Sequence, residues 1–333
     1  MSYSSDILPI LESVNKISDE KEQILNDDVG TLLLRAQKAS LTPLYELPLK
    51  EARAEFDRRS GVLELEPEDV LKTSDILIGD GEEKIPARLY RGHGCRHEAL
   101  VIFVHGGGWV LGNVESYDRL CRRFANQIRL PVVSIEYRLA PEHPFPTALN
   151  DVTTAILARS DLAQLTGVRT EKWAIMGDSA GGNLVSAALL ELPPHNHPDL
   201  QVLIYPATDF SYNTGSRLTY GQGYLLDSSL MAWFSKLYLG ELDPSNPRAS
   251  ILAHRSLAKS PSTLLVTAGL DPLSDEGVAY GCKLQKAGVG VDHLHCADLL
   301  HGFLSMPLAL PKAVMVTQQI SDYVRKILQN NIV

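Results

Sequence analysis

The stretch GDSAG at residues 177–181 holds Ser179 between two glycines, in the pattern GxSxG. It follows the apolar run KWAIM and precedes a helical stretch rich in small residues, which predicts a strand-to-helix turn that exposes the serine. The N-terminus of that helix lies beneath the hydroxyl and favours negative charge that develops in a transition state. We therefore interpret Ser179 as a nucleophile, and the alternative is a tight turn in which it only caps the helix.

A second stretch, HGGGWVLGN, begins at His105 and places three glycines directly after the apolar run ALVIFV. Glycine loses more conformational entropy on folding than any other residue, so three in a row indicate that something approaches bare backbone. Attack of a serine on an ester carbonyl produces an oxyanion, which needs fixed donors about 2.7–3.1 Å away. We expect the backbone N–H groups of Gly107, Gly108 and Ala180 to form this oxyanion hole. His105 is expected to brace the loop, and Trp109 either lines the pocket or packs in the core.

A serine hydroxyl also needs a base to take its proton and a third group to orient that base. Asp271 stands at the end of the apolar run that begins STLLVTA, and His301 follows the run that begins GVDHLH. Serine, aspartate and histidine occur in this order in one known arrangement of the catalytic triad. Asp275 is the main rival of Asp271, which could instead cap a helix. The two histidines of GVDHLH are expected to lie inside the last strand, on one face of it.

The elements that carry these residues alternate along the chain. From about residue 69, short apolar runs predict eight strands, and the later ones are separated by helical stretches such as SYDRLCRRFANQI. This alternation is typical of βαβ units, so we expect an α/β fold with a mostly parallel eight-stranded sheet flanked by helices. The eight runs are DILIG, IPARLY, ALVIFV, PVVSIEY, KWAIM, LQVLIY, STLLVTA and GVDHLH.

Two segments do not fit the alternation and predict a helical cap. Residues 1–66 carry helical patterns and no strand signal, and residues 207–260 carry helix and turn signals between two strands. Insertions at strand ends tend to be lids or caps. We therefore expect an N-terminal cap segment at 1–66 and a catalytic domain at 67–333 with a cap insertion at 207–260. The apolar stripe of the first segment is Ile24, Leu25, Val29, Leu32 and Leu33.

The composition of the chain excludes some classes of binding partner. The 333 residues include 40 acidic and 31 basic side chains, and the formal charge of -9 repels nucleic acid and anionic membrane surfaces. The N-terminus lacks the features of a secretion signal, and no apolar stretch reaches the ~20 residues of a membrane span. Four cysteines without CxxC spacing fit a reducing cytoplasm. We expect a small-molecule partner and no nucleic acid or membrane partner; a homodimer stays open.

Cofactor motifs are missing from the sequence. No GxGxxG follows a predicted strand and no GxxxxGK occurs, so a nucleotide cofactor is not expected. The histidines of PPHNHP have no cysteine or second cluster nearby in the sequence, so no metal site is expected either.

Five motifs stand in a familiar order between residues 99 and 303: HGGGW, EYRLAPEHPFPTAL, GDSAGG, DPLSDEG and HGF. In this the chain resembles the hormone-sensitive-lipase branch of the α/β-hydrolases, and within it the bacterial acetyl esterases. The resemblance implies a triad of Ser179, Asp271 and His301, the oxyanion hole named above, and a helical cap. It also implies structural roles for Glu136 and Glu142. One departure is the serine of DPLSDEG, where the family often has arginine, so local ion pairing there is open.

Together these features predict a serine carboxylesterase that hydrolyses short-chain acyl esters, acetyl to about hexanoyl, through an acyl-enzyme and without a cofactor. The chain-length range follows from the resemblance. Two alternatives stay open: a non-catalytic ligand-binding protein on the same scaffold, and an amidase or lactonase that uses the same triad.

Overall fold

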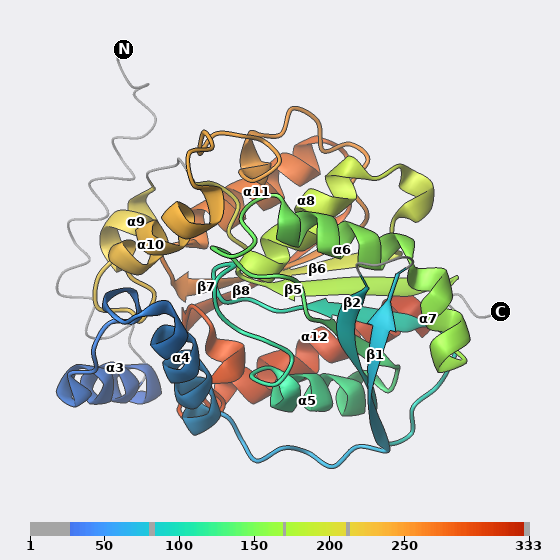
Figure 1. Cartoon of the computed structure of the whole chain (residues 1–333), viewed down its shortest axis with the longest axis horizontal. Helices are drawn as coiled ribbons and strands as arrows, with labels where there is room; N and C mark the ends of the chain where they lie inside the picture. Colours follow the sequence, from blue (N-terminus) through green and yellow to red (C-terminus); the bar gives the residue numbers. More distant parts are fainter. Residues whose placement is uncertain (1–26, 80–83, 169–170, 211–213, 330–333) are drawn as a thin grey trace.

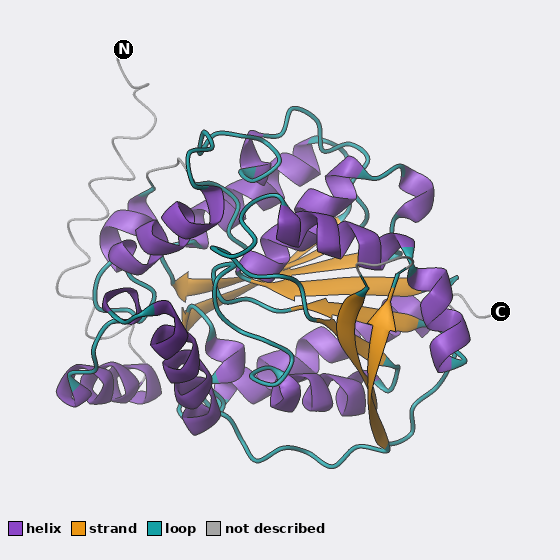
Figure 2. Ribbon diagram, viewed as in Figure 1, coloured by secondary structure: helices purple, strands orange, loops and turns teal. Residues whose placement is uncertain are grey.

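The computed structural model describes residues 27–79, 84–168, 171–210 and 214–329, and it is built around one twisted sheet of eight strands (Figures 1 and 2). The order across the sheet is β1-β2-β4-β3-β5-β6-β7-β8. Each of the eight predicted strands is present. They are β1 (Lys72–Ile78), β2 (Ile85–Arg91), β3 (Leu100–Val104), β4 (Val132–Ile135), β5 (Trp173–Asp178), β6 (Leu200–Ile204), β7 (Thr263–Leu270) and β8 (Val291–Leu300).

The direction of the strands decides where the candidate residues meet. The pairs β1–β2 and β2–β4 are antiparallel, whereas every neighbouring pair from β4 to β8 is parallel. The carboxyl ends of β3, β5, β7 and β8 therefore lie along the same edge of the sheet. The glycine loop follows β3, Ser179 follows β5, Asp271 follows β7 and His301 follows β8. The topology thus places four segments that are distant in the sequence at one edge.

Helices cover both faces of the sheet, and the central strands β3, β4, β5 and β6 are buried at every position. On β3, Leu100, Ile102 and Val104 pack in one core with α6 and α8, while Val101 and Phe103 pack in a second core with α5 and α12. Figure 1 shows α6, α8 and α11 on one side of the sheet and α5 and α12 on the other. The helices around the sheet are α5 (Asp118–Ile128), α6 (Thr147–Leu157), α7 (Arg159–Thr166), α8 (Ala180–Glu191), α11 (Ser274–Lys286) and α12 (Lys312–Gln329).

The remaining helices come from the two segments that broke the alternation. They are α3 (Asp27–Ala39), α4 (Leu49–Leu63), α9 (Gly215–Tyr220) and α10 (Ser228–Leu239), and in Figure 1 they lie on the side toward which β7 and β8 point. Short 3-10 helices are η1 (Leu44–Glu46), η2 (Pro194–Asn196), η3 (Ile251–Ala253) and η4 (Phe303–Ser305). The turn η1 contacts α10, so the two segments meet in space.

The predicted apolar stripe of the first segment is seen in part. Val29 and Leu32 on α3 are buried and Leu33 is partly buried against the core, whereas Ile24 and Leu25 lie outside the described residues. Within the part of the chain that the structure describes, no helix has the length and apolarity to cross a bilayer.

Candidate active site

Ser179 occupies a strained turn between β5 and α8. Its backbone has φ 53° and ψ −117°, a conformation that residues with a side chain rarely adopt and that is found mainly at functional sites. The flanking glycines make the turn possible. A Cβ on Gly177 would lie 2.5 Å from the backbone of Gly181, and a Cβ on Gly181 would lie 2.0 Å from the carbonyl oxygen of Val104. Strand, turn and helix can therefore pack this closely only without these two side chains.

The structure brings Ser179, His301 and Asp271 into one hydrogen-bonded chain. His301 Nε2 lies 2.9 Å from Ser179 Oγ, and His301 Nδ1 lies 2.8 Å from Asp271 Oδ2. Asp271 is fully buried and the histidine side chain is 11% exposed. Because the carboxylate can only accept, Nδ1 carries the proton and donates it to Asp271. The lone pair of Nε2 is then available to accept the hydroxyl proton of Ser179.

Geometry also separates the two aspartates that the sequence left as rivals. The second oxygen of Asp271 accepts from the N–H of Leu273 at 2.8 Å, which holds the carboxylate in place beside the histidine. Asp275 instead accepts from the N–H of Ser216 at 2.8 Å, on α9. The two other histidines of the last strand both contact Thr267 Oγ1, as expected for one face of β8, and take no part in this chain of bonds.

The glycine loop turns its backbone toward the serine through left-handed conformations. Gly107 has φ 108° and Gly108 has φ 62°, and both line a cavity beside Ser179. A Cβ at Gly107 would lie 2.1 Å from the carbonyl oxygen of Leu111, so this position has no space for a side chain. Ala180, the first residue of α8, is 1% exposed. The three residues expected to form the oxyanion hole thus come from two separate segments, the loop after β3 and the first turn of α8.

Asp178 links these two loops, and the sequence analysis missed it. Its Oδ1 accepts from the N–H of Gly106 at 2.8 Å, and its Oδ2 accepts from the hydroxyl of Tyr117 at 3.0 Å. The side chain is buried, and burial raises the pKa of Asp178 to about 6, so the carboxyl is mostly ionised at neutral pH. The signal in the sequence was a carboxylate directly after an apolar strand and directly before the nucleophile.

His105 braces the loop, as its place in the sequence suggested. It is fully buried, its Nδ1 lies 2.8 Å from the carbonyl oxygen of Gly106, and its ring stacks on Tyr137 with 4.3 Å between centroids. Burial lowers the pKa of His105 to about 4, so the imidazole is neutral and its Nδ1–H donates to the carbonyl. A buried neutral imidazole in this position supports the loop and does not face the hydroxyl.

The glutamates of EYRLAPEHP make structural contacts. Glu136 accepts from the N–H of Val114, and Glu142 forms a two-pronged ion pair with Arg53 at 2.7 and 2.8 Å. Ser274, where the resemblance suggested arginine, is buried, and its N–H donates to the carbonyl oxygen of Asp271. The serine side chain carries no charge, so this position contributes no ion pair.

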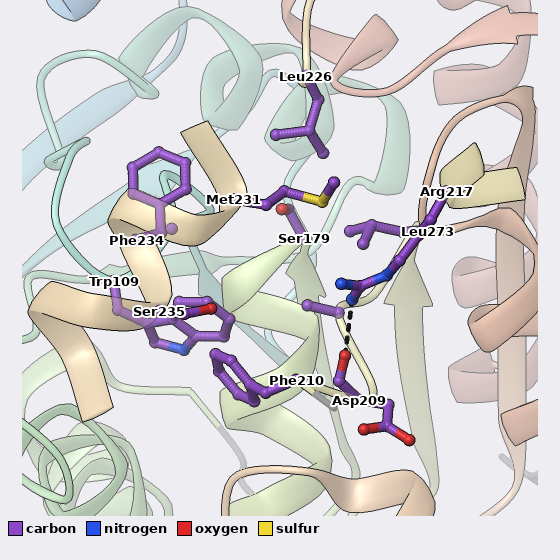
Figure 3. Close-up of a pocket in the computed structure, with 12 residues that line it drawn as sticks. Trp109, Ser179, Asp209, Phe210, Arg217, Leu226, Met231, Phe234, Ser235 and Leu273 are labelled. Carbon is purple, nitrogen blue, oxygen red and sulfur yellow. Dashed lines mark hydrogen bonds between the residues drawn. The ribbon is translucent and has the colours of Figure 1, made fainter. Parts of the chain in front are cut away.

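Two cavities open beside Ser179. The larger has a volume of about 260 Å³ and is lined by residues of α4, α10 and the loop after His301. The smaller has a volume of about 50 Å³ and is lined on one side by Trp109 and Phe210, as Figure 3 shows. Trp109 also stacks on Tyr238 with 4.7 Å between centroids, so it both lines the pocket and packs in the core.

The comparisons of this chain with known sequences agree with one another, since each finds hydrolases. The sequence model of a family described as alpha/beta hydrolase fold matches residues 101–305. The ethyl acetate hydrolase of Pseudomonas putida is 32% identical over 316 residues, which cover 90% of this chain and 99% of that protein. The carboxylic ester hydrolase LipN of Mycobacterium tuberculosis is 40% identical over 250 residues, which cover 72% of this chain and 66% of LipN.

Solved structures agree with these sequences. A hyperthermophilic esterase from the archaeon Pyrobaculum calidifontis superposes with a TM-score of 0.84 at 33% identity, covering 91% of this chain and 98% of that structure. The chain therefore belongs to the α/β-hydrolase family, within its hormone-sensitive-lipase-like branch.

Proposed function

We propose that this chain is a serine carboxylesterase that hydrolyses short-chain acyl esters, from acetyl to about hexanoyl, through an acyl-enzyme. The observation that carries the proposal is the position of His301, whose two ring nitrogens lie 2.9 Å from the Ser179 hydroxyl and 2.8 Å from the Asp271 carboxylate. Such spacing lets one imidazole accept a proton from the nucleophile while a buried carboxylate stabilises the imidazolium that forms. The names of the relatives, which include an ethyl acetate hydrolase and a carboxylic ester hydrolase, support ester hydrolysis.

In the first half of the reaction, His301 Nε2 takes the proton of Ser179 Oγ as the oxygen attacks the ester carbonyl carbon. The carbonyl oxygen becomes an oxyanion and accepts hydrogen bonds from the N–H groups of Gly107, Gly108 and Ala180. His301 then gives its proton to the alcohol oxygen, the bond from carbon to that oxygen breaks, and the acyl group remains on Ser179. In the second half, His301 Nε2 takes a proton from water as the water oxygen attacks the acyl carbon. His301 then returns the proton to Ser179 Oγ, the bond from the acyl carbon to Oγ breaks, and the acid is released.

We assign the segment up to residue 66 and the insertion at 207–260 to a cap over this site. The assignment is argued from the residues of these two segments that the structure describes. Leu44, Phe56 and Leu63 of the first segment and Leu226 and Phe234 of the second line the larger cavity together with Ser179. Such a lining excludes water from part of the reaction path and contacts the substrate on the side away from the sheet. We also assign the chain to the cytoplasm, supported by four cysteines that form no disulfide.

Turnover of p-nitrophenyl acetate tests the proposal. We expect Ser179→Ala to lower kcat on the order of 10⁶-fold while circular dichroism and the unfolding temperature stay close to those of the wild type. A fluorophosphonate probe should label the wild type and leave Ser179→Ala unlabelled. Unchanged turnover in the variant would contradict the role of Ser179, and a folded wild type that the probe does not label would indicate a binding protein.

Quenching with acid during turnover of p-nitrophenyl butyrate tests the covalent step. We expect the intact mass of the quenched wild type to rise by one butyryl group and that of Ser179→Ala to stay constant, because the acyl group is bonded to Oγ. A p-nitroanilide of the same acid is the matched substrate. Faster hydrolysis of the anilide than of the ester would identify an amidase.

A further inference from the structure

Two histidines of β8 converge on one hydroxyl, apart from the proposed triad. The strand β8 is the last in the sheet, and His293 and His295 stand two residues apart on it, so both side chains project from the same face. His293 Nε2 lies 2.7 Å from Thr267 Oγ1, and His295 Nδ1 lies 2.8 Å from the same oxygen. Each ring therefore points one nitrogen toward a common position, with 5.9 Å between the ring centroids.

We infer that His293 and His295 form a binding site for a divalent transition-metal ion of the zinc, copper or nickel class. His293 Nε2 and His295 Nδ1 are its protein ligands, and the Thr267 hydroxyl bonds to a water molecule on the metal. None of the three residues takes part in the proposed hydrolysis, so this site is additional to it.

The hydroxyl of Thr267 cannot serve both imidazoles in the same way. It carries one proton, so it donates to one ring nitrogen at most and accepts an N–H from the other ring. Among the described residues, the opposite nitrogens, His293 Nδ1 and His295 Nε2, have no hydrogen-bond partner that fixes the tautomers. Both imidazoles can thus turn a lone pair toward the common position without breaking another bond in the described part of the chain.

The distances fit a metal ion after small movements of the two rings. Imidazole nitrogens bind Zn²⁺ at about 2.0–2.1 Å, so two of them lie ~3.3 Å apart around a tetrahedral ion. Both histidines are exposed on the edge strand and can swing to this separation, whereas Thr267 on β7 is 1% exposed and fixed. A fixed hydroxyl beneath two movable imidazoles orients them toward the ion before it binds.

The ligand set selects the class of ion. Imidazole suits Zn²⁺, Cu²⁺ and Ni²⁺, whereas Mg²⁺ and Ca²⁺ need several oxygen ligands. Across the residues that the structure describes, no group of three or more histidine, cysteine, aspartate or glutamate side chains could hold a metal, so water completes the coordination. The exposure of both histidines leaves room for that water, and the formal charge of -9 attracts cations. The site is therefore open, unlike the four-ligand sites of structural zinc.

The bound ion reinforces the two strands that carry the candidate acid and base. Thr267 stands on β7, which leads to Asp271, and the histidine pair stands on β8, which leads to His301. A ligand that binds only the folded chain stabilises it according to its concentration. Zinc at ten times its Kd should therefore raise the unfolding temperature of the wild type by about 2–4 °C.

Calorimetric titration with zinc chloride tests the site. We expect His293→Gln and His295→Gln each to weaken one zinc site at least about 10-fold, because each removes one of two protein ligands. Thr267→Val should weaken the same site by about 10-fold, since the hydroxyl orients both rings. The double variant His195→Gln and His197→Gln is the matched control. It removes the other histidines that stand two residues apart, of which His197 already bonds to the carbonyl oxygen of Leu192 at 3.0 Å, and should leave this site unchanged.

Equal zinc binding by the wild type and both β8 variants would overturn the proposal, as would no binding to the wild type or a loss in the control alone. Electron paramagnetic resonance of Cu²⁺ bound to the wild type needs no variant and should show coupling to two imidazole nitrogens. Coupling to fewer nitrogens would also overturn the assignment. Unfolding temperatures without metal identify a variant that does not fold, and in that case the copper spectrum decides.

Discussion

Asp178 stands one residue before the nucleophile and binds the loop that faces it. Its carboxylate accepts the N–H of Gly106 and the hydroxyl of Tyr117, so the two segments expected to form the oxyanion hole are joined through one buried anion. Two donors converge on it, and both of its oxygens are used as acceptors. An amide in its place keeps one acceptor and turns an NH₂ group toward a donor. Asp178 therefore ties the turn that carries Ser179 to the glycine loop.

We expect Asp178→Asn to lower kcat for p-nitrophenyl acetate roughly 10- to 100-fold and to leave KM nearly unchanged. The reason is that a displaced oxyanion loop weakens bonds made only in the transition state. Asp199→Asn is the control, because Asp199 accepts a backbone N–H at the other end of β5, from Trp173 at 3.0 Å. A rise in KM with unchanged kcat, or an equal loss in the control, would contradict a positioning role for Asp178.

The helix α4 owes its place to tertiary contacts. Its sequence carries the charged run KEARAEFDRR, and two of its arginines differ sharply in their surroundings. Arg53 donates to two backbone carbonyls of neighbouring loops and pairs with Glu142, whereas Arg58 pairs with Glu55 of the same helix and its side chain is 57% exposed. Bonds from a charged group to part-buried carbonyls stabilise more than an exposed ion pair does.

Arg53→Ala should therefore lower the free energy of unfolding by about 1–3 kcal/mol, because carbonyls of Val110 and Ala140 lose a charged donor. We also expect KM for p-nitrophenyl butyrate to rise, since α4 forms a wall of the larger cavity. Arg58→Ala is the matched control on the same helix and should leave the urea unfolding midpoint and this KM unchanged. Equal effects of the two substitutions would show that α4 is not anchored through Arg53.

The folded chain as a whole buries titratable groups that act on its stability in opposite directions. The pKa of His105 is lowered to about 4 by burial, and that of Asp178 is raised to about 6. Between about pH 4 and 6.5 the unfolded chain binds a proton at His105 that the native chain does not, so this histidine makes the protein less stable as pH falls. Asp178 does the opposite between its ordinary pKa and about pH 6, because the native chain holds the proton more tightly.

Comparing the wild type with His105→Asn isolates the histidine. The asparagine can donate to the carbonyl of Gly106 but does not titrate. We expect the variant to be less stable at pH 7.5, since it loses the ring stacked on Tyr137, and the deficit to shrink by about 2 kcal/mol between pH 7.5 and 5. Urea unfolding at several pH values measures the difference. A deficit that stays constant with pH would mean that the pKa of His105 is the same in the native and unfolded chains, so that burial does not lower it.

Local patterns were sufficient for the strands and for the candidate nucleophile. Short apolar runs separated by helical stretches indicate the strands of a covered sheet, and each of the eight predicted runs forms a strand. The glycines beside Ser179 indicated the turn, because a Cβ on Gly177 would lie 2.5 Å from the backbone of Gly181 and has no room there. Helical segments before the sheet and between β6 and β7 could also be predicted from local patterns, because the spacing of apolar residues within a helix is a property of its own sequence.

The sequence by itself determined which groups are available for the proposed chemistry, since a hydroxyl, an imidazole, a carboxylate and bare amides have the same capabilities in any fold. Only the tertiary structure decided how they are combined: that His301 faces Asp271 and not Asp275, that Asp178 joins two loops, and that α4 and α10 line one cavity beside Ser179. These outcomes depend on side chains from segments far apart in the chain. Their distances are set by how strands and helices pack, which no local pattern encodes.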